Sequence, residues 1–250
     1  MNFNPKKCYI LSIQQSTSHI YSLCKTPLQY VRSNPYLGIQ FSDDLKWSTH
    51  IAHTCKKANS TLGFLRRNLR FCPLQCKKNA YLSLVRPVLE YGSIVWSPYL
   101  RQDVDKLEKV QRLSARFITG DYKTRTPGSI TSMLQSLQLQ TLEQRRRDQR
   151  LIFLYKVVEG LVPAIPSAEY LTPHKQGRLI KPRTLDTFQT ASAIQDHIKN
   201  NSRTFHVTRC KTEQFRQSFF ISAVRDWNHL NDSTVTAPSV DSFRSRIQPQ

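Results

Sequence analysis

The chain has 250 residues, 39% of them hydrophobic, and 37 Lys and Arg stand against 17 Asp and Glu, which gives a formal net charge of +20. Its aromatic and apolar content is too high for a wholly disordered chain, and seven Gly are too few for an all-β protein full of tight turns. We therefore expect a mainly α fold and a polyanionic partner, nucleic acid above all, rather than an anionic membrane.

Residues 1–49 predict a short β edge. Residues 1–42 contain no Asp or Glu. The runs 9–13 and 36–41 are rich in β-branched and aromatic residues and are bounded by Pro, Asn and Ser, which is typical of short strands. Strands this short need a larger sheet or a helix to cover them, so we expect this segment to lie at the edge of a larger folded unit.

Residues 50–160 predict a helical domain. A first helix carries an apolar stripe with heptad-like spacing: Ile51, Cys55, Ala58, Leu62, Leu65 and Leu69. A second pattern passes through Ala80, Leu84, Val85 and Leu89, and Pro87 should kink or end that helix near Arg86. Three more helices follow: about Asp103 to Gly120, with Val104, Leu107, Val110, Ser114 and Phe117 buried, about Ile130 to Leu137, and Leu142 to Glu159, with Thr141 as N-cap.

The last 90 residues predict a partly irregular region. Residues 161–211 are basic, polar and punctuated by proline, so we expect a linker with one short helix at most. Residues 212–250 regain an apolar stripe through Phe215, Phe219, Ala223, Trp227 and Leu230. Ser239 is placed to cap a final helical turn that contains Phe243 and Ile247.

No targeting or membrane-spanning segment is expected. The apolar run 8–13 is shorter than the core of a signal peptide, and the longest later run, 151–155, is far below the length of a membrane span. We expect an intracellular protein, in the nucleus or the cytoplasm, with no membrane partner. Its six Cys should then be reduced thiols rather than a disulfide framework.

Two patterns suggest metal-dependent chemistry, and neither forms a complete site. Phe41-Ser42-Asp43-Asp44 resembles a carboxylate turn for two metal ions, but no acidic residue precedes Asp43 and a helix follows, so a turn and helix lead-in is the preferred interpretation. A zinc site, and with it a metal-dependent hydrolase, would draw on His50, His53, Cys55, Cys72 and Cys76. A second matched ligand pair is missing, and Cys55 falls in the apolar stripe. We expect no catalytic residue, no resident metal and no cofactor.

Two basic clusters are the candidate binding residues. Between residues 51 and 80 the chain has seven cations and no acid, and a second cluster follows near residue 145: Lys56, Lys57, Arg66, Arg67, Arg70, Lys77 and Lys78, then Arg145 and Arg146. Uncompensated cations on consecutive helices suit contacts with phosphates. Aromatic residues nearby could stack on bases, although burial in a core is the more usual role of Tyr81, Tyr91, Trp96 and Tyr99.

Taken in order, several segments resemble reverse transcriptases of LINE-type non-LTR retrotransposons, and the jockey-like branch is the most similar. The segments that carry the resemblance are 36–39, 44–47, 50–51, 80–81, 84–92, 95–96, 107–112, 115–118, 145–146, 218–220 and 227–228. Asn4, Lys7 and Cys8 resemble the end of the last palm strand.

The resemblance implies a helical thumb-like bundle that holds an RNA/DNA duplex or hybrid, with Tyr36, Leu37 and Gly38 at a primer-grip turn. From the residues alone, that turn is a β-turn in which Gly permits close approach of the backbone. The family's catalytic aspartates would lie before Met1, so the resemblance implies a truncated RNA-directed DNA polymerase fragment, inactive alone. Magnesium would serve only an intact parent enzyme, and parent-element or host proteins are further candidate partners. The alternative is a domesticated module that binds proteins through the heptad-like stripe.

Overall fold

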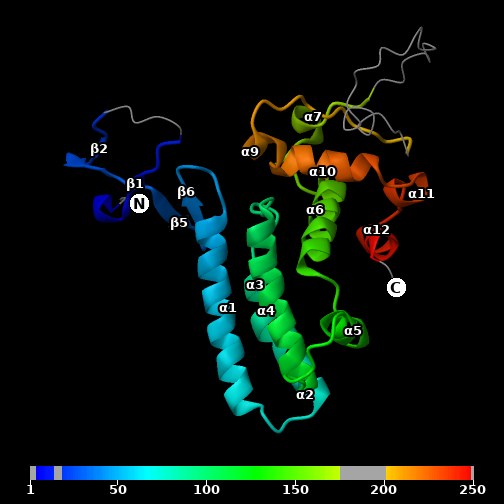
Figure 1. The fold of residues 1–250 in the computed structure, drawn as a ribbon. Helices are drawn as coiled ribbons and strands as arrows, with labels where there is room; N and C mark the ends of the chain where they lie inside the picture. Colours follow the sequence, from blue (N-terminus) through cyan, green and yellow to red (C-terminus); the bar gives the residue numbers. More distant parts are fainter. Residues whose placement is uncertain (1–3, 14–18, 175–200, 249–250) are drawn as a thin grey trace, which may run out of the picture. The chain divides into compact units, whose positions relative to one another are not determined.

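The computed structural model describes residues 4–13, 19–174 and 201–248. The fold is mainly α, as the sequence predicted, with a few short strands near the start of the chain (Figure 1). It consists of two compact units. The first comprises residues 1–92 and 96–143, and the second comprises residues 93–95 and 144–250.

Short strands open the first unit. After a 3-10 turn, η1 (Pro5–Lys7), strand β1 (Tyr9–Ile10) pairs in parallel with β4 (Gln29–Tyr30). Strands β2 (Ser22–Leu23) and β3 (Thr26–Pro27) form one antiparallel pair, and β5 (Ser33–Tyr36) and β6 (Ile39–Ser42) form another. These are three separate two-stranded pairs rather than one sheet, so the first unit depends on its helices for a core.

The β5–β6 pair forms a hairpin within the β-rich run 36–41. The chain reverses between Tyr36 and Ile39, which face each other in the register, so the β-turn expected at Tyr36, Leu37 and Gly38 is present. The two residues between them have positive φ angles, 48° at Leu37 and 80° at Gly38. This is the type I′ conformation, whose twist matches the twist of the flanking strands in a hairpin.

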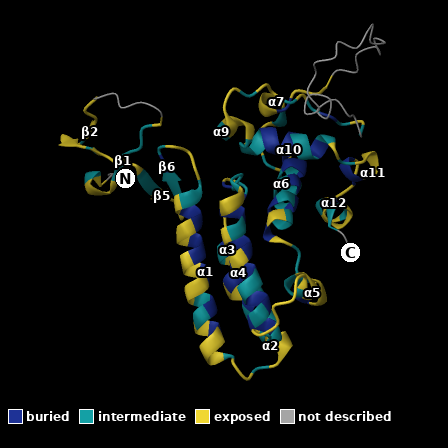
Figure 2. Ribbon diagram, in the orientation of Figure 1, coloured by how far each residue is buried: buried dark blue, intermediate teal, exposed yellow. Residues whose placement is uncertain are grey.

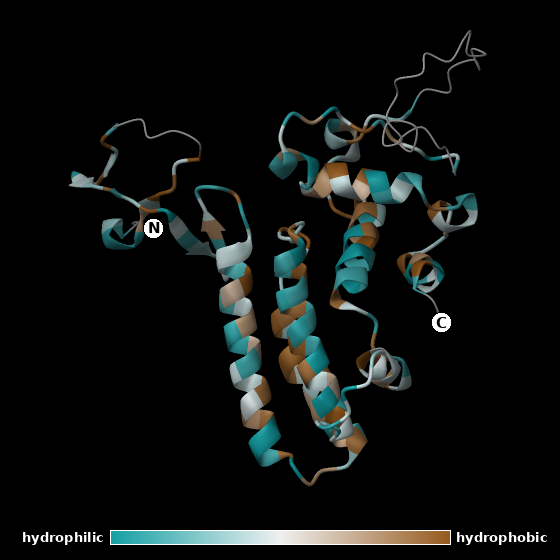
Figure 3. Ribbon diagram, in the orientation of Figure 1, coloured by the Kyte–Doolittle hydropathy of each residue, from teal (hydrophilic) through white to brown (hydrophobic). Residues whose placement is uncertain are grey.

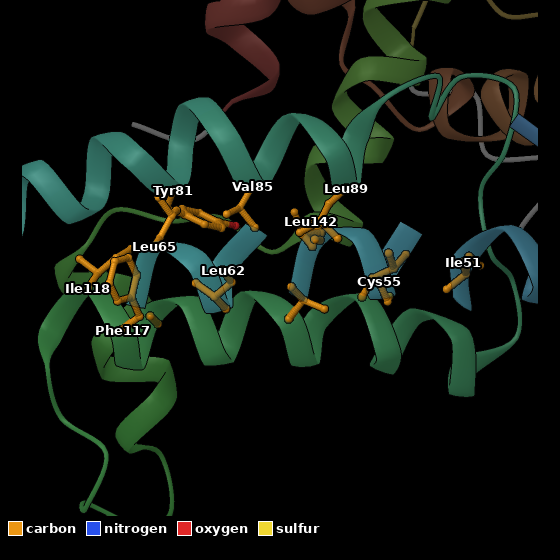
Figure 4. Close-up of a cluster of buried hydrophobic side chains, with 14 of the residues drawn as sticks. Ile51, Cys55, Leu62, Leu65, Tyr81, Val85, Leu89, Phe117, Ile118 and Leu142 are labelled. Carbon is orange, nitrogen blue, oxygen red and sulfur yellow. The ribbon is translucent and has the colours of Figure 1, made fainter. Parts of the chain in front are cut away.

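Helix α1 (Ser48–Asn68) confirms the predicted heptad-like stripe. Its buried side chains include Ile51, Cys55, Ala58, Leu62 and Leu65, and Leu69 is partly buried just beyond its end. They pack against α4 (Arg101–Thr119) and against the helical segment 74–90. Figure 4 shows the resulting row of aliphatic and aromatic side chains, and Figure 2 shows the contrast between the buried and exposed faces of α1.

The segment after α1 is one continuous helix in three parts: α2 (Leu74–Ala80), a π-helical turn η2 (Tyr81–Val85) and α3 (Arg86–Glu90). The helix does not end at Arg86, which was one of the two outcomes predicted for Pro87; instead its regular α-helical geometry changes to a π-helical turn directly before Arg86. Pro87 has no N–H to give, and the π-helical turn accommodates it because the Arg86 N–H reaches back five residues to the Tyr81 carbonyl. The wider turn shifts the buried face, so Tyr81 is buried while Leu84 is 50% exposed.

Helix α4 matches its prediction. Asp103 lies in its first turn, Gly120 ends it with a left-handed φ of 76°, and all five predicted core residues are buried. A polar contact ties it to the π-helical turn, because the buried Tyr81 hydroxyl donates to Gln111 Oε1 at 3.0 Å. The Gln111 amide in turn donates to the Gln140 carbonyl, after α5 (Ser129–Ser136), at 2.8 Å.

The second unit contains most of α6 (Leu142–Val158), then α7 (Ser167–Tyr170), α9 (Glu213–Arg216), α10 (Phe219–Asn228), α11 (Asp232–Val235) and α12 (Val240–Ile247). Its core centres on Trp227, which is stacked on Phe243 with ring centroids 5.7 Å apart. Tyr155 from α6 stacks on the other side of that cluster, 4.5 Å from Phe243. Figure 3 shows that the apolar residues of α10 lie mostly in its first half.

The segment 161–211, expected to be a linker, carries the single short helix α7 in its described part. Residues 175–200 lie outside the described residues. Beyond them the chain packs into the second core: the Trp227 indole donates to the Arg203 carbonyl at 2.8 Å, and Phe205 contacts the Trp227 ring. The predicted cap at Ser239 is present, since its side chain accepts the Ser242 N–H, and Thr212 caps α9 in the same way.

Candidate nucleic-acid interface

The outward face of α1 carries the first basic cluster. Burial of the apolar stripe turns the opposite side of the helix to solvent, and Lys56, Lys57, Arg66 and Arg67 are all exposed there, as is Arg70 just after the helix. Lys56 and Arg67 are separated by about 16 Å along the axis, at about 1.5 Å per residue. This length spans several consecutive phosphates of one strand, which lie about 3.4 Å apart along a duplex.

These cations are uncompensated. Helix α1 contains no Asp or Glu, and within the described part of the chain none of the seven cations between residues 51 and 80 forms an ion pair. Other basic residues differ: Arg101 pairs with Asp105 and Glu143, and Lys106 pairs with the buried Asp103 at 2.7 Å. The positive potential of α1 is therefore not cancelled locally.

A hollow of about 380 Å³ lies at the C-terminal end of this face. It is lined by Gly63, Arg66, Arg67, Arg70 and Tyr122. Gly63 leaves space where any other residue would place a side chain, and the Arg67 guanidinium lies 3.7 Å from where a Gly63 Cβ would be. The Arg66 guanidinium stacks over the Tyr122 ring at 5.0 Å from its centroid. Three guanidinium groups thus surround one concave surface with an aromatic wall.

The loop after α4 places Tyr122. Asp121 accepts the backbone N–H groups of Lys123 and Thr124, both at 3.0 Å, and a hydrogen bond from the Thr124 side chain, followed by these backbone hydrogen bonds, lowers the pKa of its carboxyl group. Arg116 donates to the carbonyls of Asp121 and Thr124, at 3.1 and 2.9 Å. The sequence did not single out Tyr122, because a loop residue has no periodicity to mark it; its only signal was its position two residues after the helix-ending Gly120.

The remaining predicted cations are less exposed. Lys77 and Lys78, in the last turn of α2, are half-buried, and the Lys77 ammonium lies 6.0 Å from the centroid of the Phe117 ring. In the second unit Arg145 is half-buried and Arg146 is only 2% exposed. The neighbouring Arg147 and Arg150 hold Asp226 of α10, at 3.3 and 2.6 Å. The α6 cluster therefore has structural partners that α1 lacks.

The expected primer-grip-like turn is the tip of the β5–β6 hairpin. Tyr36 and Leu37 are 66% and 74% exposed, so their side chains are open to solvent. The Tyr91 hydroxyl donates to the Leu37 carbonyl at 3.0 Å, and its ring lies 3.3 Å from where a Gly38 Cβ would be. Gly38 therefore permits close approach between the turn and Tyr91.

Of the aromatic residues considered for base stacking, Tyr81 and Trp96 are fully buried in the first core. The Trp96 indole donates to the Tyr91 carbonyl at 2.8 Å, which is a structural role. Tyr91 is 59% exposed and Tyr99 is half-buried. Tyr122 and Phe71 are aromatic side chains that do lie beside the exposed arginines, since Arg66 lies over the Tyr122 ring at 5.0 Å and Arg70 over the Phe71 ring at 5.4 Å.

Asp43 and Asp44 lie in the turn between β6 and α1. Asp44 Oδ1 accepts the Ser42 hydroxyl at 2.7 Å and the Lys46 N–H at 3.0 Å, so it organises the lead-in to the helix. His50 is buried, and its Nδ1 accepts the Gln40 N–H at 3.2 Å. In residues 4–13, 19–174 and 201–248, no three His, Cys, Asp or Glu side chains are close enough together to hold a metal ion.

Comparison with known proteins relates the chain to a retrotransposon. It is 38% identical over 73 residues to the 115 kDa protein in the type-1 retrotransposable element R1DM of Drosophila melanogaster. The match covers 28% of this chain and 7% of that protein. No protein-family model and no solved structure matches the chain. None of the helices in the described segments has the length and apolarity needed to cross a bilayer. Similarity to a retrotransposon protein is thus the result that the comparisons support.

Proposed function

We propose that the first unit is a thumb-like domain, derived from a retrotransposon reverse transcriptase, that binds the sugar–phosphate backbone of an RNA/DNA hybrid or a duplex. The observation that carries the proposal is the acid-free outer face of α1, where exposed cations have no ion-pair partner in the described structure. The similarity to a retrotransposon protein supports the biological context.

The chemistry of the face favours backbone contacts over reading of the base sequence. Exposed Lys and Arg on one rigid helix meet phosphates, which fix position and carry no sequence information. Binding should therefore be insensitive to sequence and strongly dependent on salt. We take one neutralised phosphate for each of the five cations Lys56, Lys57, Arg66, Arg67 and Arg70. A plot of the logarithm of affinity against the logarithm of salt concentration then has a slope of about −4.5, so affinity falls roughly 500-fold between about 50 and 200 mM salt.

The stripe of α1 does not serve the alternative, a protein-interaction module. Ile51, Ala58, Leu62 and Leu65 are at most 3% exposed inside the first core. A partner could reach them only by displacing α4 or the 74–90 helix. We therefore favour the charged face over the apolar face as the functional surface.

A mobility-shift titration at several salt concentrations tests the proposal with a hybrid and a duplex of the same sequence. The double variant Lys56→Gln/Lys57→Gln should weaken binding to both and make the slope shallower by about 1.8. Lys211→Gln, which removes an exposed charge from the second unit, should leave the slope unchanged. A wild-type chain whose binding is absent, or does not respond to salt, would refute the proposed function.

A further inference from the structure

The hollow beside α1 has features that a flat backbone-binding face does not need. A row of exposed cations is enough to track phosphates, but here three arginines surround a concavity of about 380 Å³ with an aromatic wall. The hollow is a depression that is open to solvent, so a ligand can enter it without displacing part of the fold. The face therefore carries a local site within a general charged surface.

We propose that this hollow binds one unpaired nucleotide of a single strand that adjoins the gripped duplex. The inference rests on the proposed function and adds a specific ligand class to it. The phosphate of the nucleotide contacts Arg67 and Arg70, and its base stacks on the Arg66–Tyr122 pair.

The Arg66–Tyr122 pair is suited to a base rather than to phosphate alone. The Arg66 guanidinium lies over the Tyr122 ring, 5.0 Å from its centroid, so a planar cation and an aromatic ring are available at one place. Tyr122 remains 39% exposed. Unpaired bases stack on aromatic rings and on guanidinium planes, whereas bases inside a duplex are already stacked on their neighbours. The Arg66–Tyr122 pair thus favours an unpaired nucleotide that lies outside the duplex.

Arg67 and Arg70 line the same hollow and supply further positive charge. The absence of a side chain at Gly63 leaves the helix surface open at this point, and the Arg67 guanidinium lies close to it. The loop acid Asp121 forms no ion pair with these arginines in the described structure, and its carboxylate accepts the backbone N–H groups of its own loop. A phosphate entering beside Gly63 therefore meets guanidinium groups.

Gly63 allows the hollow to be tested separately from the charge. Gly63→Leu fills the space and keeps all three arginines. Gly63→Ala is the matched control, because a Cβ there meets only Arg67 Nη1, at an ordinary contact distance of 3.7 Å. Tyr122→Ala removes the aromatic wall, and Tyr122→Phe restores the ring without the hydroxyl group.

The experiment compares the affinity of the whole chain for three probes at one salt concentration: a blunt duplex, the same duplex with a short single-stranded tail, and a duplex with an abasic tail. We expect the tailed duplex to bind about tenfold more tightly than the blunt one, and the abasic tail to lose most of that gain. Gly63→Leu and Tyr122→Ala should abolish the preference while blunt-duplex affinity stays within about twofold. Gly63→Ala and Tyr122→Phe should retain it.

The outcomes separate the two proposals. If the wild-type chain binds blunt and tailed duplexes equally, the nucleotide site is refuted and the duplex grip stands. The same holds if the abasic tail binds as tightly as the normal tail, because the hollow would then take only phosphate. A tail preference that survives both Gly63→Leu and Tyr122→Ala would place the unpaired strand elsewhere. If no probe binds at all, the duplex grip fails, and the nucleotide site fails with it.

Discussion

Gly92 holds the β5–β6 hairpin against the helical core, and Gly92→Ala should destabilise the first unit strongly. Its φ angle is 65°, and an added Cβ would lie 2.7 Å from Ile39 Cδ1. Ile39 is 6% exposed, so its side chain has little room to move. A left-handed conformation costs an alanine about 1–2 kcal/mol and overpacking about 1–3 kcal/mol, which together lower the free energy of unfolding by about 2–5 kcal/mol.

Gly63→Ala is the matched substitution with the opposite expected sign. Gly63 lies inside α1, and an added Cβ makes no close contact. Alanine should therefore raise the free energy of unfolding by about 0.5–1 kcal/mol. Urea denaturation followed by tryptophan fluorescence measures both variants, since Trp47 and Trp96 belong to the first unit. If the urea midpoint of Gly92→Ala is not lower than that of Gly63→Ala, the assigned φ and packing at Gly92 are wrong.

Three further predictions concern other parts of the chain. Leu62→Ala, which truncates a side chain only 2% exposed, should lower the free energy of unfolding by about 2–5 kcal/mol in urea denaturation. Burial, helped by the charge of His53, lowers the pKa of His50 below its usual value near 6.5. The folded chain then binds fewer protons than the unfolded chain. The contribution of His50 to the free energy of unfolding should therefore be fully present above the usual pKa and should be lost as the pH falls toward the folded-state pKa. His50→Gln should make the melting temperature less dependent on pH across this range. Asp226→Asn removes the partner of Arg147 and Arg150 and should cost the second unit about 1–2 kcal/mol, because the groups are partly exposed. No loss on thermal melting would mean that the pair is only a surface contact.

The sequence predicted the helices whose burial follows a regular period. The stripe of α1 and the five buried positions of α4 appear where the spacing placed them, since one face of each helix meets a single core. Gly120 as a helix stop and Ser239 as a cap were found because stops and caps favour particular residue types at particular positions.

The predictions failed where the backbone departs from regular geometry. Leu84 was expected in the core and Tyr81 was not placed on the stripe, because a π-helical turn rotates the residues after it relative to an α-helical count. The candidate hollow depended on Tyr122, whose proximity to α1 is a tertiary property that no local pattern contains.

The distribution of charge gives the α1 face opposite responses to salt before and after binding. Arg66, Arg67 and Arg70 lie within five residues of one another and make no ion pair in the described structure, so they repel each other in the free chain. Like charges at such spacings destabilise a helix by about 0.2–0.5 kcal/mol per pair, and salt screens that repulsion.

Moderate salt should therefore raise the melting temperature of the first unit in the free chain while it weakens binding to a duplex. At low salt, bound duplex should raise the melting temperature by more than added salt raises it in the free chain. The phosphates offset the repulsion between the arginines, and binding also stabilises the folded state by mass action. Calorimetric melting with and without duplex, across one salt series, measures both trends; if they run in the same direction, the uncompensated arginines are not the binding surface.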